Sequence, residues 1–512
     1  MKPIPPQVSF PELEKETLAF WRQHKTFERS VEQRRAQNAK AFMFYDGPPF
    51  ATGLPHYGHL LQGTIKDIVP RYQTMKGALV ERRFGWDTHG VPVEMQVEGE
   101  LGLRGRTDVL EYGVGKFNEA CRASVLKYVN DWRRITERLG RWIDFDNDYK
   151  TMDRSYMESV WWVVKQLWDA GRVYEGQRIV PYSWRLTTTL SNFEAGLNYK
   201  DVQDPAVTVR FKLLDRPGVS VLAWTTTPWT LISNLALCAH PKHKYVQVKT
   251  STGESIIMAE ARLTAYFKKP SEYVVEAEFL GKELEGQRYE PLFNYHLAVA
   301  GDNSFKVVCD EYVSLDDGTG LVHQAPCYGE DDYRVCARYK IPVVDSIDVE
   351  GNFLASIPEL QGQNFKEAEK QILTMLKASG LLYKQDVINH SYPFCWRSDT
   401  PLMYRAVAAW YVRVEEIRDS MSSNNATVHW VPEFIGANRF GNWLGQARDW
   451  NISRNRFWGN PIPVWRCESC KTTECLGGAE ELEQRCGAKV ADLHSHFIDE
   501  LTWSCKCGGM MK

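Results

Sequence analysis

The sequence predicts an α/β protein: a doubly wound parallel sheet, a β-rich domain inserted into it, and a cysteine-rich tail. Three observations indicate this. A strand-like run, a Gly/Pro loop and a helical period follow one another near residues 40–76, β-type runs gather after about Tyr182, and two close cysteine pairs lie near the end. With 512 residues, the chain exceeds what one core usually serves, so we expect two to four domains.

Composition narrows the class of protein. Hydrophobic residues make up 43% and charged residues 25%, which is typical of a soluble globular protein. The net charge of −3 excludes an overall basic coat, so any RNA contact must come from local patches. No apolar run reaches the about 18 residues of a membrane span, and the start lacks a signal-peptide core. Twelve cysteines fit reduced thiols with a metal cluster, as expected of a cytoplasmic protein.

The first third of the chain predicts the start of the doubly wound sheet. One or two helices are expected within residues 10–35, then a short strand at residues 40–46 that ends at the loop "DGPPFATGLPHYGH". A helix from about Tyr57 to Lys76 and a second strand in "ALVERRFGWDTHG" follow. Helical periodicity then returns between residues 116 and 170.

The middle of the chain is rich in β-type runs. They are "AVTVRFKLL", "VSVLAWTTT", "KYVQVKT", "ESIIMAE" and "FKVVCDEYV", separated by Gly, Pro and Asp. A segment with helical periodicity and many aromatic residues follows, and the cysteine-rich segment comes last. We predict N-terminal helices and the first half of the α/β domain at 1–184, the insertion at 185–392, a return to the α/β domain at 393–466, and a cysteine-rich segment at 467–512.

The loop before the predicted helix has the features of a phosphate site. It stands where a parallel strand ends and a helix begins, and ligands bind beyond the carboxyl ends of such strands. Free N–H groups at a helix N-terminus suit phosphate. The glycines would let backbone approach a ligand and the prolines would stiffen the turn. These residues are Gly47, Gly53, Gly58, Pro48 and Pro49.

Two histidines complete this loop. His56 and His59 are three apart, so one helical face can aim both rings at the same phosphates. Because no acid/base pair or nucleophile stands beside them, the predicted chemistry is stabilisation of charge on a transferring phosphorus. The alternative is a Gly/Pro loop with two incidental histidines.

These residues resemble a known family. His56-Tyr57-Gly58-His59 is similar to the HIGH signature of class I aminoacyl-tRNA synthetases. The text around it, "GWDTHGVPVE" (Gly85 to Glu94) and "DWNISRNRFWGNPIPVW" (Asp449 to Trp465) resemble isoleucyl-tRNA synthetases in particular. The resemblance covers essentially the whole chain. It implies a Rossmann-like catalytic domain, an inserted editing domain and a small zinc-binding tail.

The resemblance also implies an activity, a ligase reaction. Isoleucine would attack the α-phosphorus of ATP, with Mg²⁺ on the phosphates, and isoleucine would then pass to tRNA(Ile). His56 and His59 would act on the triphosphate together with Gly58, and Asp87 would hold the ammonium group of the amino acid. Gly47 and Pro48 would line the side-chain pocket. Without the resemblance, Asp87 before threonine is more simply a turn cap.

A pocket for isoleucine cannot strongly reject valine, which is smaller by one methylene, so a second hydrolytic site is expected. "WTTTPWTLISN" and "GTGLVHQAPCYGEDDY" resemble the editing site of isoleucyl and valyl enzymes. The resemblance implies these roles: Thr225, Thr226, Thr227 and Asn234 on the misacylated 3′ adenosine and its water, His323 at the amino-acid pocket, Asp332 on the ammonium. A plain β segment and a solvated acidic turn are the alternatives. Ile232 departs from the family, which usually has proline there.

The cysteine tail predicts a metal site. Cys467-x-x-Cys470 is followed after 34 residues by Cys505-x-Cys507, and two close pairs suit tetrahedral Cys₄ zinc. Such a site is structural because no coordination position stays open. Competing ligands are Cys475, Cys486, His494 and His496, and free thiols are the alternative. No second zinc is expected at Cys395, which lacks a neighbouring cysteine.

Members of the resembled family carry a KMSKS loop and an anticodon-binding domain after the region matched here, and no KMSKS-like run occurs in this sequence. We therefore expect the N-terminal part of a longer enzyme, which would activate isoleucine poorly alone. Expected partners are ATP, L-isoleucine and tRNA(Ile), with no membrane and a monomeric state. Two other classes stay open: a free-standing editing hydrolase for valyl-tRNA(Ile), and a non-catalytic tRNA-binding module. The editing motifs alone also fit a valyl enzyme.

Overall fold

The computed structural model describes residues 7–512, and the chain divides into two compact units. The first runs to Val173 and resumes at Arg456, and the second comprises Tyr174–Asn455. This division differs from the predicted boundaries at 184, 392 and 466. Residues 393–455 group with the second unit because β14 (Met403–Val412) lies beside β3 (Val173–Ser183) in one sheet.

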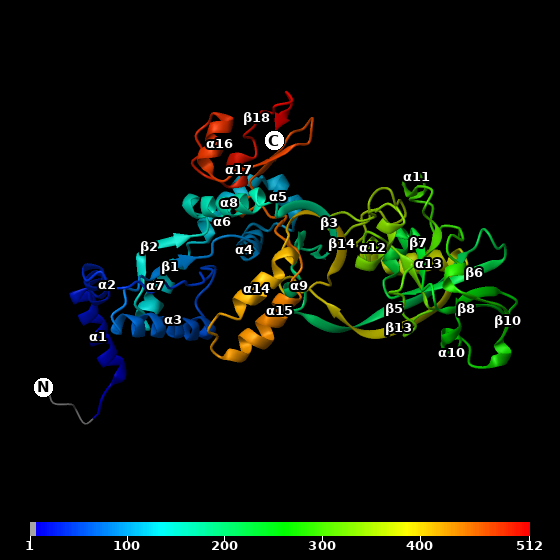
Figure 1. Cartoon of the computed structure of the whole chain (residues 1–512), viewed down its shortest axis with the longest axis horizontal. Helices are drawn as coiled ribbons and strands as arrows, with labels where there is room; N and C mark the ends of the chain where they lie inside the picture. Colours follow the sequence, from blue (N-terminus) through cyan, green and yellow to red (C-terminus); the bar gives the residue numbers. More distant parts are fainter. Residues whose placement is uncertain (1–6) are drawn as a thin grey trace. The chain divides into compact units, whose positions relative to one another are not determined.

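The first unit is mostly helical (Figure 1). Its helices are α1 (Phe10–His24), α2 (Thr26–Ala36), α3 (Tyr57–Met75), α4 (Val91–Leu101), α5 (Arg106–Tyr112), α6 (Val114–Ser124), α7 (Val129–Arg138), α8 (Arg154–Asp169), α16 (Ala479–Cys486) and α17 (Ser495–Ile498). Its strands are β1 (Arg83–Trp86), β2 (Asp144–Lys150), β16 (Val464–Arg466), β17 (Thr473–Cys475), β18 (Trp503–Ser504) and β19 (Met510–Met511). The predicted helices at 10–35 and 57–76 are confirmed, whereas the helical region predicted at 116–170 is interrupted by β2.

The parallel sheet is smaller than predicted. β1 and β2 pair in parallel, from Arg83 opposite Asp144 to Trp86 opposite Lys150. The strand predicted at residues 40–46 is wrong as a continuous element: only an isolated bridge between Ala41 and Leu79 forms there. Met43 and Tyr45 are 72% and 86% exposed, so their side chains are not packed in a core among residues 7–512.

Three clusters form the core of the first unit. Phe84 and Trp86 of β1 pack with Trp132 of α7, and Val93 of α4 packs with Phe117 of α6 and with Trp458. Buried apolar residues of α8 pack against the C-terminal segment; they include Met157, Trp161, Trp465, Leu482 and Leu493. Segments from both ends of the sequence therefore share one core, which fixes the loops that surround β1.

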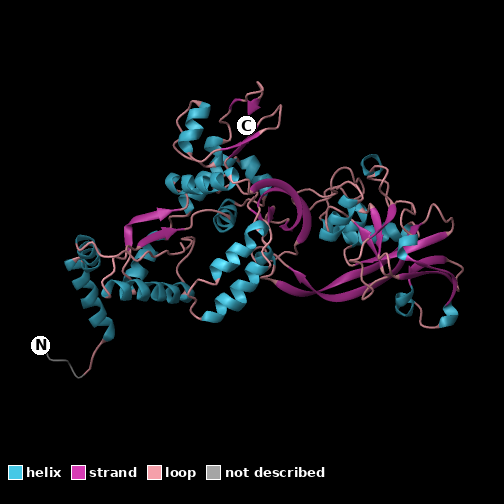
Figure 2. Cartoon of the chain, viewed as in Figure 1, coloured by secondary structure: helices cyan, strands magenta, loops and turns pink. Residues whose placement is uncertain are grey.

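The second unit is rich in β structure (Figure 2). Its sheets have the orders β10-β8-β9-β6-β5-β13, β11-β7-β12 and β15-β14-β3-β4. The strands not yet located are β4 (Thr188–Thr189), β5 (Tyr199–Lys212), β6 (Val219–Thr225), β7 (Ala236–Ala239), β8 (Lys244–Thr250), β9 (Ser255–Ala259), β10 (Tyr273–Leu280), β11 (Lys306–Cys309), β12 (Leu321–Gln324), β13 (Leu382–Pro393) and β15 (Trp450–Asn451). The five predicted β runs coincide with β5, β6, β8, β9 and β11.

Helices of the second unit are short apart from one. They are α9 (Asn192–Ala195), α10 (Leu263–Tyr266), α11 (Leu297–Ala300), α12 (Glu330–Arg338), α13 (Phe365–Ala378), α14 (Arg418–Asn425) and α15 (Gly441–Gly445), with a π-helical turn at Ile435–Phe440. The long antiparallel pair of β5 and β13, visible in Figure 2, runs from Tyr199 opposite Pro393 to Val209 opposite Leu382. Among the described residues, no helix combines the length and apolar character that a bilayer crossing requires.

Candidate functional site

The N-terminus of α3 is capped by the two predicted histidines. The His56 Nδ1 atom accepts a hydrogen bond from the Gly58 amide at 3.1 Å, and the His56 amide donates to His59 Nδ1 at 3.2 Å. The two rings stack with centroids 3.8 Å apart. This reciprocal arrangement is a capping box, which satisfies two amides that a helix start otherwise leaves free.

Capping decides what the rings can offer a ligand. A ring nitrogen that accepts a hydrogen bond carries no proton, so each neutral imidazole carries its proton on Nε2. Burial, followed by the charges of His56 and Lys66, lowers the pKa of His59, which also favours its neutral form. Both rings therefore present an N–H group that can donate a hydrogen bond to a phosphate oxygen. Gly58 is required for this packing, since a Cβ there would lie 3.0 Å from His56 Cε1.

A cavity of about 280 Å³ opens beside this helix start. The residues that line it include Gly47, Pro48, Pro49, His59, Lys66, Trp132 and Arg141. The structure thus brings Gly47, Pro48 and His59 to one cavity. His56, Gly58 and Asp87 are not among its lining residues.

Two cations at the cavity were not predicted. Lys66 and Arg141 both pair with the carboxylate of Asp46, and Lys66 also donates to the Gly47 carbonyl at 3.3 Å. Lys66 lies seven residues after His59, two turns along the same face of α3, and this spacing was visible in the sequence. Arg141 follows α7, far away in the sequence, so no local pattern indicated it. The pair adds positive charge where the helix N-terminus already favours anions.

Asp87 lies directly after β1 and is half-buried. Its amide donates to the Pro49 carbonyl at 2.9 Å, so the segment that carries Asp87 runs beside the glycine-proline loop. The ring of Tyr149 fills the space next to Gly85, where a Cβ would come within 2.1 Å of the ring. The Tyr149 hydroxyl donates to the Asp46 carbonyl at 3.2 Å, which ties β2 to the same loop.

The threonines of the second unit form a chain of hydroxyls. β6 ends at Thr225, whose Oγ1 accepts from the Thr227 amide at 3.1 Å. Thr227 Oγ1 lies 3.3 Å from that of Thr230, which in turn lies 3.1 Å from His323 Nε2. Thr225 is buried, whereas Thr226 and Thr227 are half-buried. The chain therefore links three threonine hydroxyls, those of Thr225, Thr227 and Thr230, to the buried His323.

His323 lies in β12, and Asp332 follows nine residues later in α12. Burial lowers the pKa of His323 to about 4, so the ring is neutral, and its Nδ1 has no hydrogen-bond partner among the described residues. Asp332 stands in the first turn of α12, and its Oδ1 accepts from the Ala325 amide at 2.7 Å. Burial raises the pKa of Asp332 to about 7 despite that hydrogen bond.

Asn234 also has a structural role that the sequence did not predict. Its Oδ1 accepts from the Tyr289 hydroxyl at 2.7 Å, and its Nδ2 donates to the Ala236 carbonyl at 2.9 Å. Each end of the buried amide is thus engaged once within the unit. Ile232, where the resembled family usually has proline, is buried in the main core.

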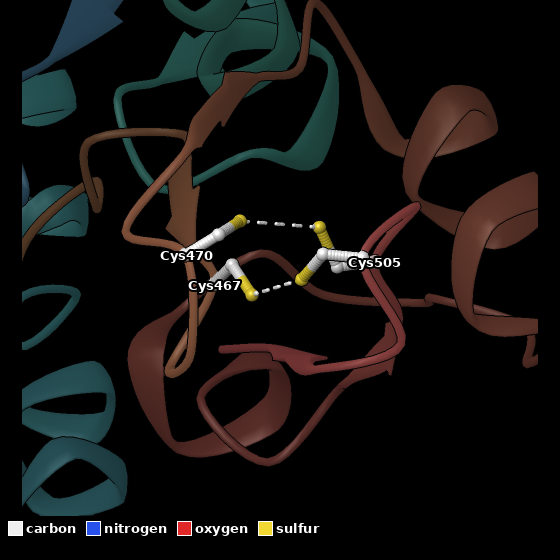
Figure 3. Close-up of side chains that lie close together, drawn as sticks. Cys467, Cys470 and Cys505 are labelled. Atoms are coloured by element: carbon white, nitrogen blue, oxygen red, sulfur yellow. Dashed lines mark hydrogen bonds between the residues drawn. The ribbon is translucent and has the colours of Figure 1, made fainter.

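Four cysteines meet in the C-terminal segment (Figure 3). The Sγ atoms of Cys467, Cys470, Cys505 and Cys507 all lie within 4.8 Å of one another. Cys467 Sγ is 3.5 Å from Cys507 Sγ, and Cys470 Sγ is 3.8 Å from Cys505 Sγ. A Cβ on Gly509 would lie 2.8 Å from Cys467 Sγ, so glycine is needed for the turn.

The competing ligands lie outside this cluster. Cys475 is buried, and its burial raises its pKa to about 12. His494 and His496 bond to carboxylates of the same unit, and Cys486 Sγ lies 3.8 Å from the Ala488 carbonyl. By contrast, the Thr472 hydroxyl and amide lower the pKa of Cys470 to about 6, which favours the thiolate that binds metal. The four-cysteine set matches the donors of tetrahedral zinc.

Residues 16–510 match the model for "tRNA synthetases class I (I, L, M and V)", and the chain belongs to this family. It is 50% identical over 511 residues to "Isoleucine--tRNA ligase, cytoplasmic" of Mus musculus, covering 99% of this chain and 40% of that one. It is 49% identical over 545 residues to "Isoleucine--tRNA ligase" of Treponema denticola, covering 100% of this chain and 49% of the other.

The chain therefore spans between two fifths and one half of the length of these curated relatives. Among solved structures, a match covers 97% of this chain and 57% of a chain described as "Crystal structure of the ternary complex of Agrobacterium radiobacter K84 agnB2 LeuRS-tRNA-LeuAMS". Its sequence identity is 17% and its TM-score 0.37. These values are too low to carry an argument about this chain.

Proposed function

We propose that this chain serves in isoleucine–tRNA ligation, the ATP-dependent activation of isoleucine and its transfer to tRNA(Ile) with hydrolytic removal of valine. The observation that carries this proposal is the identity of about 50% to isoleucine–tRNA ligases along the whole chain. The geometry at α3 supports it, because His59, Lys66 and Arg141 line one cavity beside the helix start, where His56 caps the helix. This reaction would take place in the cytoplasm.

In the activation step, a carboxylate oxygen of isoleucine attacks the α-phosphorus of ATP and pyrophosphate leaves. His56 and His59 donate from Nε2 to phosphate oxygens, where negative charge grows in the transition state. Mg²⁺ bound to the phosphates supplies further charge neutralisation. Lys66 reaches the same oxygens once phosphate competes with Asp46 for it. Asp87 pairs with the ammonium group, and Gly47 and Pro48 bound the side chain.

In the editing step, water attacks the ester carbonyl of valyl-tRNA(Ile). Asp332 holds the valyl ammonium group as a carboxylate, and His323 limits the size of the side chain. Thr226 and Thr227, which are more exposed than Thr225, contact the terminal adenosine and its water. Zinc on Cys467, Cys470, Cys505 and Cys507 supports the fold of the tail without a catalytic role.

The test measures two partial reactions of the chain. Equilibrium dialysis compares the binding of L-isoleucine, L-valine and L-leucine, and a deacylation assay follows valyl-tRNA(Ile). We expect isoleucine to bind most tightly, and Asp332→Ala to slow deacylation at least tenfold. Tighter binding of leucine, or deacylation equal to that of the Asp332→Ala variant, would contradict the proposal.

A further inference from the structure

Residues 87–90, which we name the Asp87 loop, connect β1 to α4 and carry the carboxylate assigned to the ammonium group. Several segments hold this loop. The Asp87 amide donates to the Pro49 carbonyl at 2.9 Å. Thr151, which directly follows β2, holds the buried Thr88. The Thr88 amide donates to Thr151 Oγ1 at 2.9 Å, and the two hydroxyls are 2.9 Å apart.

Trp458 holds the same loop from the C-terminal segment. Its indole Nε1 donates to the Thr88 carbonyl at 2.5 Å, and its carbonyl accepts from the Gly90 amide at 3.0 Å. Trp458 is fully buried, and the carboxylate of Glu94 accepts from its amide at 2.7 Å. The indole is therefore a fixed wall against which the loop lies.

A second histidine pair holds the middle of the loop. His89 Nε2 lies 2.8 Å from Nε2 of His494, which is fully buried. The His494 ring stacks on Trp458 with centroids 4.2 Å apart and planes 7° apart. On its far side, His494 Nδ1 lies 2.5 Å from Oδ1 of Asp492. None of these contacts belongs to the phosphate or cysteine sites described above.

The hydrogen bonds determine the direction of the pair. Burial raises the pKa of Asp492, but the hydrogen bonds from His494 and the charge of Arg122, which donates to it at 2.6 Å, outweigh burial and lower that pKa. An ionised Asp492 accepts from Nδ1–H of His494, and the 2.8 Å contact between the Nε2 atoms of His494 and His89 extends this chain to the loop. His89 is neutral because burial lowers its pKa to about 3. The order Asp492, His494, His89 therefore fixes one orientation of the His89 ring.

We propose that His89 and His494 are positioning residues for amino-acid binding: their imidazole pair fixes the Asp87 loop so that the Asp87 carboxylate meets the substrate ammonium group. This inference rests on the proposed function of Asp87. The residues touch no reacting atom and act through the loop. Displacement of a binding group by about 1 Å can cost roughly 100-fold, so a pair that removes such freedom has a measurable effect.

Hydrogen exchange tests the positioning directly. The variants are His89→Gln, His494→Gln and the double variant, and His496→Gln is the matched control. His496 lies in the same segment but bonds to Asn118 at 3.0 Å and Glu119 at 3.1 Å, away from the loop. We expect faster amide exchange in peptides covering 87–90 for the first three variants, with unchanged exchange in α3 and in the control. Unchanged exchange at 87–90 would overturn the proposal.

Binding provides the second measurement. We expect His89→Gln and His494→Gln each to weaken L-isoleucine binding about tenfold, with ATP affinity changed less than twofold. The double variant should bind no more weakly than either single variant, because the two residues form one unit. Equal losses for ATP and isoleucine would overturn the proposal. If Asp87→Ala leaves isoleucine binding intact, the proposed role of Asp87 fails, whereas the exchange experiment still decides whether the pair fixes the loop.

Discussion

Substitution of Gly58 by alanine separates helix stability from phosphate binding. The added Cβ would lie 3.0 Å from Cε1 and 3.1 Å from Nδ1 of His56, so the ring must move. The hydrogen bond from the Gly58 amide to His56 Nδ1 is then lost, and a lost N-cap costs about 1 kcal/mol. Replacing glycine by alanine within a helix returns about 0.5–1 kcal/mol. The two effects nearly cancel, so we expect the melting temperature to change by no more than a few degrees.

The effect of Gly58→Ala on ATP binding has no such compensating term. A hydrogen bond to a charged group is worth about 1.5–3 kcal/mol, so loss of the His56 donor should weaken ATP binding roughly 10- to 150-fold. Titration calorimetry with ATP and a thermal melt of the same sample measure both quantities. Gly99→Ala is the control: Gly99 lies within α4 with open space around its Cβ, so it should stabilise the chain and leave ATP binding unchanged. Unchanged ATP affinity in Gly58→Ala would refute the assignment of His56 as a phosphate donor.

Four further predictions concern other parts of the chain. Because the pKa of Asp332 is raised to about 7, deacylation of valyl-tRNA(Ile), measured as kcat/KM, should fall as pH decreases below about 7, and a flat profile between pH 6 and 8 would contradict this. Between its unfolded pKa and about 7, the Asp332 carboxyl keeps its proton only in the folded state. The free energy of unfolding, measured in urea, should therefore fall as pH rises through that range. The Asp332→Asn variant should not show this fall. Gly509→Ala places a Cβ 2.8 Å from Cys467 Sγ and should reduce bound zinc below one per chain, measured by atomic emission; full zinc content would count against the Cys₄ site. Gly85→Ala should destabilise the chain by about 1–3 kcal/mol through overpacking against Tyr149, and combining it with Tyr149→Ala should recover part of that loss in urea unfolding.

Local patterns predicted the local elements. The start of α3 was predictable because a histidine pair, glycine and an amphipathic period all lie within about twenty residues. The strand at 40–46 was predicted from apolar residues alone, but a strand also needs neighbours. Met43 and Tyr45 stay exposed, and the exposed apolar residues Leu61, Ile65 and Ile68 of α3 likewise find no cover among residues 7–512.

Contacts between distant residues were not predictable from one sequence. The two compact units divide the chain at other positions than the predicted boundaries, because pairing of β14 with β3 joins segments more than 200 residues apart. Arg141 and Asp46 form an ion pair between distant parts of the first unit, and the sequence around either residue does not predict its partner. Asn234 was assigned to a substrate by its neighbours in the sequence, whereas Tyr289 takes its amide oxygen. In each case the deciding partner comes from a different element.

The same hydrogen bonds that begin α3 also determine its chemistry. If His56 and His59 used Nε2 to cap the helix, Nδ1 would face the ligand from a position crowded by the backbone. Because Nδ1 accepts from backbone amides at 3.1 and 3.2 Å, the proton of each neutral ring must sit on Nε2 before any nucleotide arrives. No proton has to move and no ring has to turn when phosphate binds, which is the condition for efficient electrostatic stabilisation. The helix cap and the phosphate donor are therefore one feature. Any substitution that removes the hydrogen bond to Nδ1 should also misplace the Nε2 donor.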